Sequence, residues 1–152
     1  AGGDEGEGHP VRVLFVCTGN INRSAAAEMI ARAVAPEIEA RSAACNGQAG
    51  RPMPRRMRAA PAAVGLPVLP HRSTALTADL VAWADLTVGM QPSHLRAVAE
   101  LGGRARSMVD WSSASLSKVP DPQFGGAESF PLVVQILLDA VPRLCRETGE
   151  QR

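Results

Sequence analysis

Cys17 and Arg23 are separated by five residues in the stretch "VCTGNINRS" (16–24). A turn of this length, made flexible by Gly19, can point its backbone N–H groups inward and form a concave anion site. The N-terminus of a following helix adds partial positive charge, and the planar Arg23 guanidinium can bind two phosphate oxygens at once. The spacing therefore predicts a phosphate-binding loop with a thiol at its base.

The thiol of Cys17 is the candidate nucleophile of this loop. The positive field that holds a phosphate also favours the thiolate, and Ser24 at the helix start can donate a hydrogen bond to the sulfur. A thiolate beside a bound phosphate dianion is placed for in-line attack, which gives a phosphocysteine intermediate. The plain alternative is a buried strand-end cysteine and a surface arginine. The apolar strand before Cys17 and the helix pattern directly after Ser24 favour the phosphate loop.

Asp121 is the candidate acid, because phosphoryl transfer needs a proton for the leaving oxygen and a loop carboxylic acid can supply it. It stands between two prolines in "VPDPQFGG" (119–126). Asp-Pro is also a common turn dipeptide, so the motif alone has little specificity. Its place in a long polar loop, 110–127, predicts that Asp121 lies on the rim of the site, since such a long loop in a compact domain usually has a function.

Short apolar runs alternate with amphipathic ones along the chain. The apolar runs predict four strands, at 11–16, 38–44, 85–90 and 104–109. Helices are expected at 24–35, 53–65, 77–84 and 92–103, and a last one at 128–148 that is kinked or interrupted near Pro131 and Pro142. The alternation predicts an α/β fold, a four-stranded parallel sheet with helices on both faces. Ligands bind such sheets at the carboxyl ends of the strands, where Cys17 is expected to lie.

Composition limits the classes of protein to consider. The 152 residues fit one domain, which we expect at 11–152, after a disordered tail at 1–10 that is rich in glycine and acidic residues. Sixteen basic and fifteen acidic residues give a net charge of +1, which offers no argument for a nucleic-acid partner. No stretch approaches the ~20 apolar residues of a membrane span. Lys118 is the only lysine and alanine is abundant, which is typical of a GC-rich bacterial genome.

Cysteine and histidine usage indicates free thiols and no metal. Three cysteines, an odd number without framework spacing, favour a reducing cytoplasm. His9, His71 and His94 show no ligand spacing, so we predict no metal and no cofactor. The sequence leaves the oligomeric state open.

The chain resembles the low-molecular-weight protein tyrosine phosphatases. The resemblance covers residues 11–147 and is carried, in order, by "VCTGNINRS", "SAA" (42–44), "GLPVLPHRS" (65–73), "ADLTVGM" (84–90) and "DPQFG" (121–125). It implies Cys17 as the nucleophile, Arg23 as the phosphate clamp, and Asp121 as the acid for the leaving group and then the base for the hydrolytic water. It further implies a network that holds the loop, made of Asn20, Ser24, Ser42 and His71, and substrate contacts from the loop residues Thr18, Gly19, Ile21 and Asn22.

Two departures from the family pattern concern the thiol and its arginine. The family often has a second cysteine at the position of Asn22, so a protective disulfide partner for Cys17 is missing unless Cys45 supplies it. Gln91 stands where the family usually has an aspartate, which puts a supporting contact in doubt but not the mechanism.

Two further departures concern the substrate. The aromatic walls of phosphotyrosine-directed members correspond here to Gln48, Gln123 and Phe124, so a single ring remains. Each lost aromatic contact removes roughly 0.5–1.5 kcal/mol beyond simple burial. Four arginines crowd the segment beside the pocket, as either a solvated helix face or a basic rim that attracts extra negative charge; they are Arg51, Arg55, Arg56 and Arg58.

These features predict a phosphomonoesterase whose substrate is a small anionic metabolite such as a sugar or nucleoside phosphate. A protein phosphotyrosine phosphatase is the main alternative, so the partner is a phosphorylated small molecule or phosphoprotein. A thiol-dependent arsenate reductase needs two further cysteines after the third strand, and residues 85–127 contain none. A phosphocarrier has no use for Asp121 or the Arg23 clamp, and a non-catalytic phosphate-binding module does not need this full set of groups.

Overall fold

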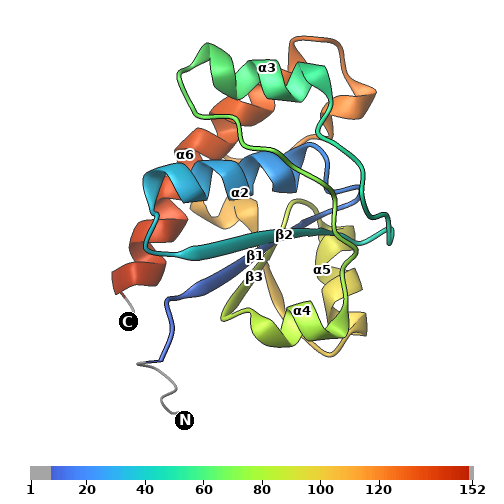
Figure 1. The fold of residues 1–152 in the computed structure, drawn as a ribbon, viewed down its shortest axis with the longest axis vertical. Helices are drawn as coiled ribbons and strands as arrows, with labels where there is room; N and C mark the ends of the chain where they lie inside the picture. The colour runs from blue at the N-terminus through green and yellow to red at the C-terminus, as the bar shows by residue number, and fades with distance from the viewer. Residues whose placement is uncertain (1–7, 151–152) are drawn as a thin grey trace.

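The structure, a computed structural model, describes residues 8–150. Its centre is a parallel sheet of four strands, β1 Arg12–Cys17, β2 Glu39–Ala44, β3 Leu86–Gly89 and β4 Ala105–Ser107. The strands lie in the order β2-β1-β3-β4 (Figure 1). Since β1 pairs with β2 on one side and with β3 on the other, the strand order reverses at β1. Its carboxyl end is therefore the place where a ligand site is expected.

Strand β1 is buried on both faces of the sheet. Val13, Leu14, Phe15 and Val16 are all 0 % exposed. Because side chains alternate along a strand, Val13 and Phe15 enter the larger core, and Leu14 and Val16 enter a smaller core on the opposite face. The continuous apolar run is what a strand covered on both sides requires.

Helices cover both faces, and the predicted α/β architecture is confirmed. Helix α2 (Arg23–Val34) and the long α6 (Ser129–Glu150) pack together over one face, and α3 (Arg55–Ala63) packs on α6 (Figure 1). Helices α4 (Ala78–Trp83) and α5 (Pro92–Glu100) lie on the other face, against β1, β3 and β4.

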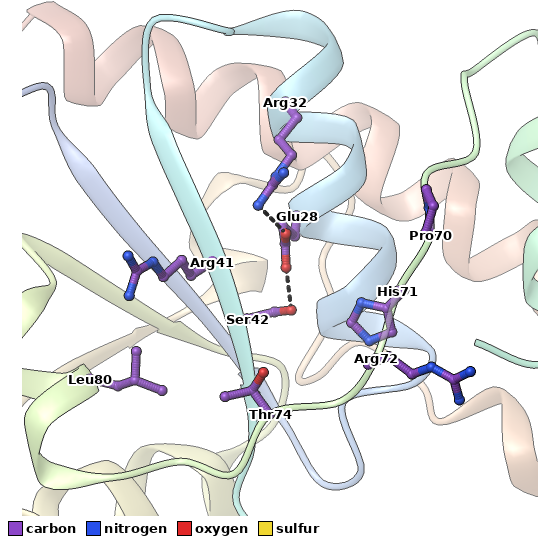
Figure 2. Close-up of a pocket in the computed structure, with 9 residues that line it drawn as sticks. All are labelled: Glu28, Arg32, Arg41, Ser42, Pro70, His71, Arg72, Thr74 and Leu80. Atoms are coloured by element: carbon purple, nitrogen blue, oxygen red, sulfur yellow. Dashed lines mark hydrogen bonds and ion pairs between the residues drawn. The ribbon is translucent and has the colours of Figure 1, made fainter. Parts of the chain in front are cut away.

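A polar contact joins β2 to the helix that precedes it. The Ser42 hydroxyl donates to Glu28 Oε1 at 2.5 Å, and Arg32 Nη2 lies 2.7 Å from Glu28 Oε2 (Figure 2). Glu28 and Arg32 are four residues apart on α2, the spacing at which an ion pair forms on one helix face. The carboxylate therefore ties α2 to the strand.

The chain after β3 differs in detail from the predicted pattern. The fourth strand is shorter than the predicted 104–109, because residues Met108–Trp111 turn into a 3-10 helix, η1. The predicted loop 110–127 also contains a second 3-10 helix, η2, at Pro122–Phe124. Asp121 precedes η2 directly, so the candidate acid is held at a defined helix start rather than in open loop.

The last helix was predicted to be kinked or interrupted, and the interruption is wrong, because α6 runs without a break from Ser129 to Glu150. Pro131 lies in the first turn, where backbone N–H groups have no partner within the helix in any case. Pro142 lies inside the helix, flanked by the buried Val141 and Leu144. Packing of this apolar face into the core outweighs the hydrogen bond that a proline removes.

Residues 1–7 of the predicted tail lie outside the described residues, and residues 8–10 have no regular secondary structure. Across residues 8–150, no helix has both the length and the apolar character that crossing a bilayer requires.

Candidate active site

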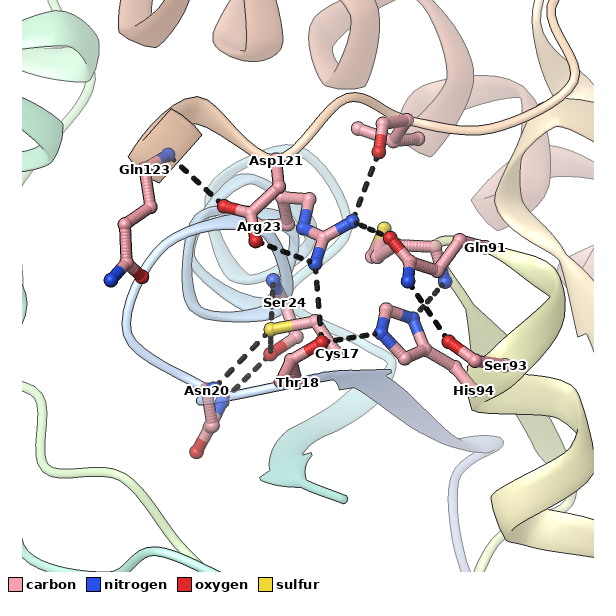
Figure 3. A network of polar contacts seen from close by, with 12 residues as sticks. Cys17, Thr18, Asn20, Arg23, Ser24, Gln91, Ser93, His94, Asp121 and Gln123 are labelled. Carbon is pink, nitrogen blue, oxygen red and sulfur yellow. Dashed lines mark hydrogen bonds and ion pairs between the residues drawn. The ribbon is translucent and has the colours of Figure 1, made fainter. Parts of the chain in front are cut away.

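The turn between β1 and α2 surrounds the sulfur of Cys17. Cys17 is the last residue of β1, Arg23 is the first residue of α2, and residues 18–22 curl around the thiol (Figure 3). The turn forms one wall of a cavity of about 260 Å³. The cavity is lined by Cys17, Thr18, Gly19, Asn20, Ile21, Asn22, Arg23, Asn46, Gln48, Arg51, Asp121, Gln123 and Phe124.

Three hydrogen-bond donors converge on the Cys17 sulfur. The backbone N–H groups of Asn20 and Ser24 lie 3.3 and 3.5 Å from Sγ, and the Ser24 hydroxyl lies 2.9 Å from it. The direction of the last bond follows from its neighbours. Thr74 N–H donates to Asn20 Oδ1, so the Asn20 amide NH₂ faces Ser24 Oγ at 2.8 Å and donates to it. The Ser24 hydroxyl hydrogen is then directed at the sulfur, which is the arrangement that stabilises a thiolate.

Asn20 holds the turn in its shape. Its φ of 56° makes it the one non-glycine residue in the left-handed region among residues 8–150, a conformation that asparagine tolerates better than most residues. His71 Nε2 lies 2.6 Å from the Asn20 carbonyl oxygen, and since a carbonyl only accepts, Nε2 is the donor. His71 thus fixes the backbone of Asn20 while Thr74 fixes its side chain.

Arg23 is buried, with 2 % of its surface exposed, and its two terminal nitrogens have different surroundings. Nη1 donates to the Gln91 amide oxygen at 2.6 Å and to the Val119 carbonyl at 3.0 Å. Nη2 faces the cavity, 3.4 Å from Asp121 Oδ2 and 3.5 Å from Thr18 Oγ1. One side of the guanidinium is therefore held by the protein and the other is directed toward the ligand space.

Asp121 lies across the cavity from the loop, and the backbone of the first residues of η2 positions its side chain. Its Oδ1 accepts from Gln123 N–H at 3.0 Å as the N-cap of η2, and Oδ2 faces Arg23. Its side chain is 23 % exposed, so it borders both the cavity and solvent. The Arg23 bond to the Val119 carbonyl, two residues earlier, ties this loop to the site.

The rim of the cavity carries one aromatic ring and one arginine. Phe124 is 85 % exposed. Gln48 and Gln123, which the family resemblance places at the positions of aromatic walls, also line the cavity. Arg51 also lines it and donates to the Gln48 amide oxygen. The other three arginines of the segment are exposed on α3 outside this cavity, so the basic-rim hypothesis applies to Arg51 alone.

Ser42 was expected to support the loop, and the structure places its hydroxyl elsewhere. Ser42 pairs with Phe15, whereas Cys17 pairs with Ala44, so Ser42 lies two residues short of the sheet edge. From there its hydroxyl reaches Glu28, and it lines a second cavity, of about 370 Å³, with His71 and Thr74 (Figure 2). His71 and Thr74, which also line that cavity, are the residues that contact the loop, at Asn20.

Cys45 does not share a core with Cys17. Its side chain packs against the smaller core, whereas Cys17 belongs to the larger core on the other face. Burial, together with the nearby Cys17, raises the pKa of the Cys45 thiol. Asn22, at the position of the family's second loop cysteine, is buried with 6 % exposed. The arrangement gives no support to Cys45 as a disulfide partner.

Two residues that follow β3 contact the site: Gln91, whose supporting contact the sequence left in doubt, and His94 in the first turn of α5, for which the sequence predicts no role in the site. Gln91 holds Arg23, and His94 Nε2 lies 3.0 Å from Thr18 Oγ1. Burial, and next the charge of Arg23, lower the pKa of His94 to about 4. Since β3 lies beside β1, polar residues after its carboxyl end lie at the same sheet edge as Cys17. This property of parallel sheets could have predicted from the sequence that Gln91 and His94 lie near Cys17. Asn46, which also lines the cavity, follows β2 in the same way.

Comparisons with known proteins agree with this geometry. The family model described as low molecular weight phosphotyrosine protein phosphatase matches residues 12–152. The low molecular weight protein-tyrosine phosphatase A of Mycobacterium tuberculosis is 32 % identical over 148 residues, which is 89 % of this chain and 90 % of that protein.

Two crystal structures show the same fold. A protein tyrosine phosphatase from Entamoeba histolytica, with Hepes in its active site, has a TM-score of 0.84 at 27 % identity and covers 93 % of this chain and 98 % of that one. The tyrosine phosphatase Wzb from Escherichia coli K30, in complex with sulphate, has a TM-score of 0.82 at 27 % identity and covers 91 % and 98 %.

Proposed function

The chain belongs to the low-molecular-weight protein tyrosine phosphatase family and is a cysteine-dependent phosphatase, and from this premise we propose that Cys17, Arg23 and Asp121 hydrolyse phosphate monoesters in two steps. Cys17 is the nucleophile, Arg23 binds the phosphoryl oxygens, and Asp121 transfers the protons. The binding of sulphate, a tetrahedral anion, by the relative Wzb supports an oxyanion in the cavity over Cys17.

In the first step the Cys17 thiolate attacks phosphorus and the bond to the ester oxygen breaks. Asp121, as the carboxylic acid, gives its proton to that oxygen, and the alcohol or phenol leaves. Arg23 Nη2 and the loop N–H groups stabilise the charge on the three remaining oxygens, which is the main task of a protein in phosphoryl transfer. The product is phosphocysteine.

In the second step a water molecule attacks the phosphorus of phosphocysteine. The Asp121 carboxylate accepts a proton from that water, the P–S bond breaks, and inorganic phosphate leaves. The sulfur departs as the thiolate, which the Ser24 hydroxyl and the two backbone N–H groups are placed to receive. Asp121 is again protonated, so the cycle is closed.

The observation that carries this proposal is the convergence of three donors on the Cys17 sulfur next to the cavity-facing Nη2 of a buried arginine. The test is rapid-quench kinetics with p-nitrophenyl phosphate. We expect a burst of nitrophenol equal to the enzyme concentration and a phosphoenzyme whose label maps to Cys17. Cys17→Ser should form no phosphothiol and turn over no substrate, yet still bind inorganic phosphate. Turnover by Cys17→Ser at the wild-type rate would exclude the mechanism.

For the natural substrate we propose a small anionic metabolite phosphate. Arg51 on the cavity wall supports it, since its guanidinium contacts an amide oxygen rather than a carboxylate, so its partner there does not compensate its positive charge. The second candidate is a phosphotyrosine protein, which Phe124 on the rim and the names of the relatives favour. A panel of sugar phosphates, nucleotides and phosphotyrosine peptides decides between them by kcat/KM. The highest value for the peptides would favour the second candidate.

Arsenate reduction is supported less well. Its relay needs thiols that can reach Cys17. Cys45 packs on the opposite face of the sheet, and burial raises the pKa of the Cys145 thiol to about 11. Free thiols also support a reducing compartment, and we propose the cytoplasm.

A further inference from the structure

His94 is a fully buried histidine that takes no part in the steps proposed above. It lies in the first turn of α5 and 0 % of its surface is exposed. Its two ring nitrogens contact two different segments at the edge of the site. Nδ1 lies 3.1 Å from the backbone nitrogen of Met90, and Nε2 lies 3.0 Å from Thr18 Oγ1 (Figure 3). The ring therefore bridges the end of β3 and the phosphate loop.

These contacts fix the position of the proton on His94. The backbone N–H of Met90 can only donate, so Nδ1 accepts, and the neutral ring carries its hydrogen on Nε2. A second proton on Nδ1 would face the Met90 N–H. Burial and the nearby Arg23 also lower the pKa of His94 to about 4, so the ring is neutral at neutral pH. Nε2 is therefore a permanent donor to the Thr18 hydroxyl.

The direction of the Thr18 hydroxyl follows from its donors. A hydroxyl oxygen accepts at two lone pairs and donates one hydrogen. Thr18 Oγ1 faces His94 Nε2–H at 3.0 Å and Arg23 Nη2–H at 3.5 Å. With donors on its acceptor side, the hydroxyl hydrogen has to point away from both. Thr18 lines the cavity together with Cys17 and Asp121, so the ligand space is open to this hydrogen.

We propose that the Thr18 hydroxyl donates a hydrogen bond to an oxygen of the phosphoryl group over Cys17, and that His94 is the positioning residue that fixes this direction. The inference rests on the proposed function, because it requires a phosphoryl group at that place. A donor that is already oriented acts on the charge of the transition state without reorganisation. Arg23 and Thr18 then present two side-chain donors to the same anion, and residues that follow β3 hold both: Gln91 holds Arg23 and His94 holds Thr18.

The test uses matched substitutions of the two residues. Thr18→Val keeps the shape of the side chain and removes the hydroxyl. His94→Asn keeps an acceptor near the Nδ1 position and removes the donor, whereas His94→Gln keeps a donor near the Nε2 position. The readouts are kcat/KM for p-nitrophenyl phosphate, the inhibition constant of vanadate, and the thermal midpoint of each variant.

We expect Thr18→Val and His94→Asn each to lower kcat/KM and vanadate affinity about tenfold, as for a lost hydrogen bond to a charged group. The double variant should lose no more than Thr18→Val alone, because the two residues act through one hydroxyl. His94→Gln should recover activity to within about threefold of wild type. A purely structural histidine would not give this rescue or this coupling.

Losses that multiply in the double variant would overturn the inference, as would a Thr18→Val enzyme within twofold of wild type. If the His94 variants do not fold, Thr18→Val and Thr18→Ser still test the role of the hydroxyl. Only the serine variant keeps the hydroxyl, so only this variant should keep the vanadate affinity of wild type. A wild-type protein without activity on phosphomonoesters would overturn the proposed function along with the inference. An active wild type with multiplying losses would overturn the inference alone.

Discussion

The Arg23 guanidinium donates through Nη1 to the Gln91 amide oxygen at 2.6 Å, across the gap between the phosphate loop and the β3–α5 turn. The Gln91 NH₂ group in turn donates to Ser93 Oγ at 2.9 Å, so the orientation of the amide is fixed. The family pattern has an aspartate at this position. A neutral amide oxygen makes the supporting contact here, so the ion pair of Arg23 is with Asp121 at the cavity and not with this residue.

Removal of the Gln91 oxygen should weaken phosphate binding. We expect Gln91→Ala to raise the inhibition constant of inorganic phosphate and KM about tenfold, because a buried hydrogen bond to a charged group is lost and Arg23 is less well oriented. Gln91→Glu is the matched control, since it keeps an oxygen at the same place, and it should stay closer to wild type. Equal losses in the two variants would mean that the amide oxygen does not hold Arg23.

The acid role of Asp121 predicts a dependence on the leaving group. We expect Asp121→Asn to slow hydrolysis of alkyl phosphates about 100-fold or more, while p-nitrophenyl phosphate, whose leaving group needs little protonation, slows far less. Asp110→Asn is the control, because Asp110 pairs with Arg106 on the surface. The measurement is kcat/KM for a series of esters of rising leaving-group pKa. A uniform loss across the series would remove Asp121 from the acid role.

The reactivity of Cys17 should depend on Ser24 and not on Ser42. The Ser24 hydroxyl donates to the sulfur at 2.9 Å, whereas the Ser42 hydroxyl donates to Glu28. We expect Ser24→Ala to slow alkylation of Cys17 by iodoacetamide at pH 7 about tenfold, since a donor to the thiolate is lost. Ser42→Ala should change the rate less than twofold. If Cys17 in Ser42→Ala is alkylated as slowly as in Ser24→Ala, Ser42 supports the loop as the family resemblance implies.

Local sequence was enough to predict the elements that hold the chemical groups. An apolar run, a glycine-containing turn and a helix start require Cys17 and Arg23 to face one space, because the turn is short. Parallel strands place their carboxyl ends at one edge, and Asp121 follows the fourth strand. Both features follow from chain connectivity and strand direction, which can be predicted from sequence patterns.

Side-chain partners across the sheet edge could not be predicted in the same way. Ser42 lies two residues before the end of β2, and only the register with β1 shows that it reaches Glu28 and not the loop. His94 and Gln91 contact Thr18 and Arg23 because β3 lies directly beside β1, which depends on strand order. Register and strand order result from packing of the whole domain.

Stability should fall in acid partly through His94. Its pKa is about 4 in the folded protein, below the ordinary value of 6.5. Between these values the unfolded chain binds more protons than the folded one, so stability decreases as pH falls from 6.5 to 4. The shift corresponds to about 3 kcal/mol at the acid end. Urea unfolding from pH 7.5 to 4.5 should therefore show a shallower pH dependence for His94→Gln than for wild type, and the same slope in both would contradict the prediction.

Arg51 should favour substrates that carry a second negative charge. It is the one arginine of residues 51–58 that lines the cavity, and its partner there is the Gln48 amide. We expect Arg51→Gln to lower kcat/KM for 4-carboxyphenyl phosphate about fivefold more than for phenyl phosphate, as for a solvent-exposed ion pair. Each variant is compared with wild type on the same ester, so the different leaving groups of the two esters do not affect the comparison. Arg55→Gln, on the exposed face of α3, is the control and should affect both esters equally.

The effect of Arg51→Gln should become smaller as salt is added, because the two charges interact near solvent. An Arg51→Gln enzyme with the wild-type ratio for the two esters would show that the cavity does not bind a second charge through this residue.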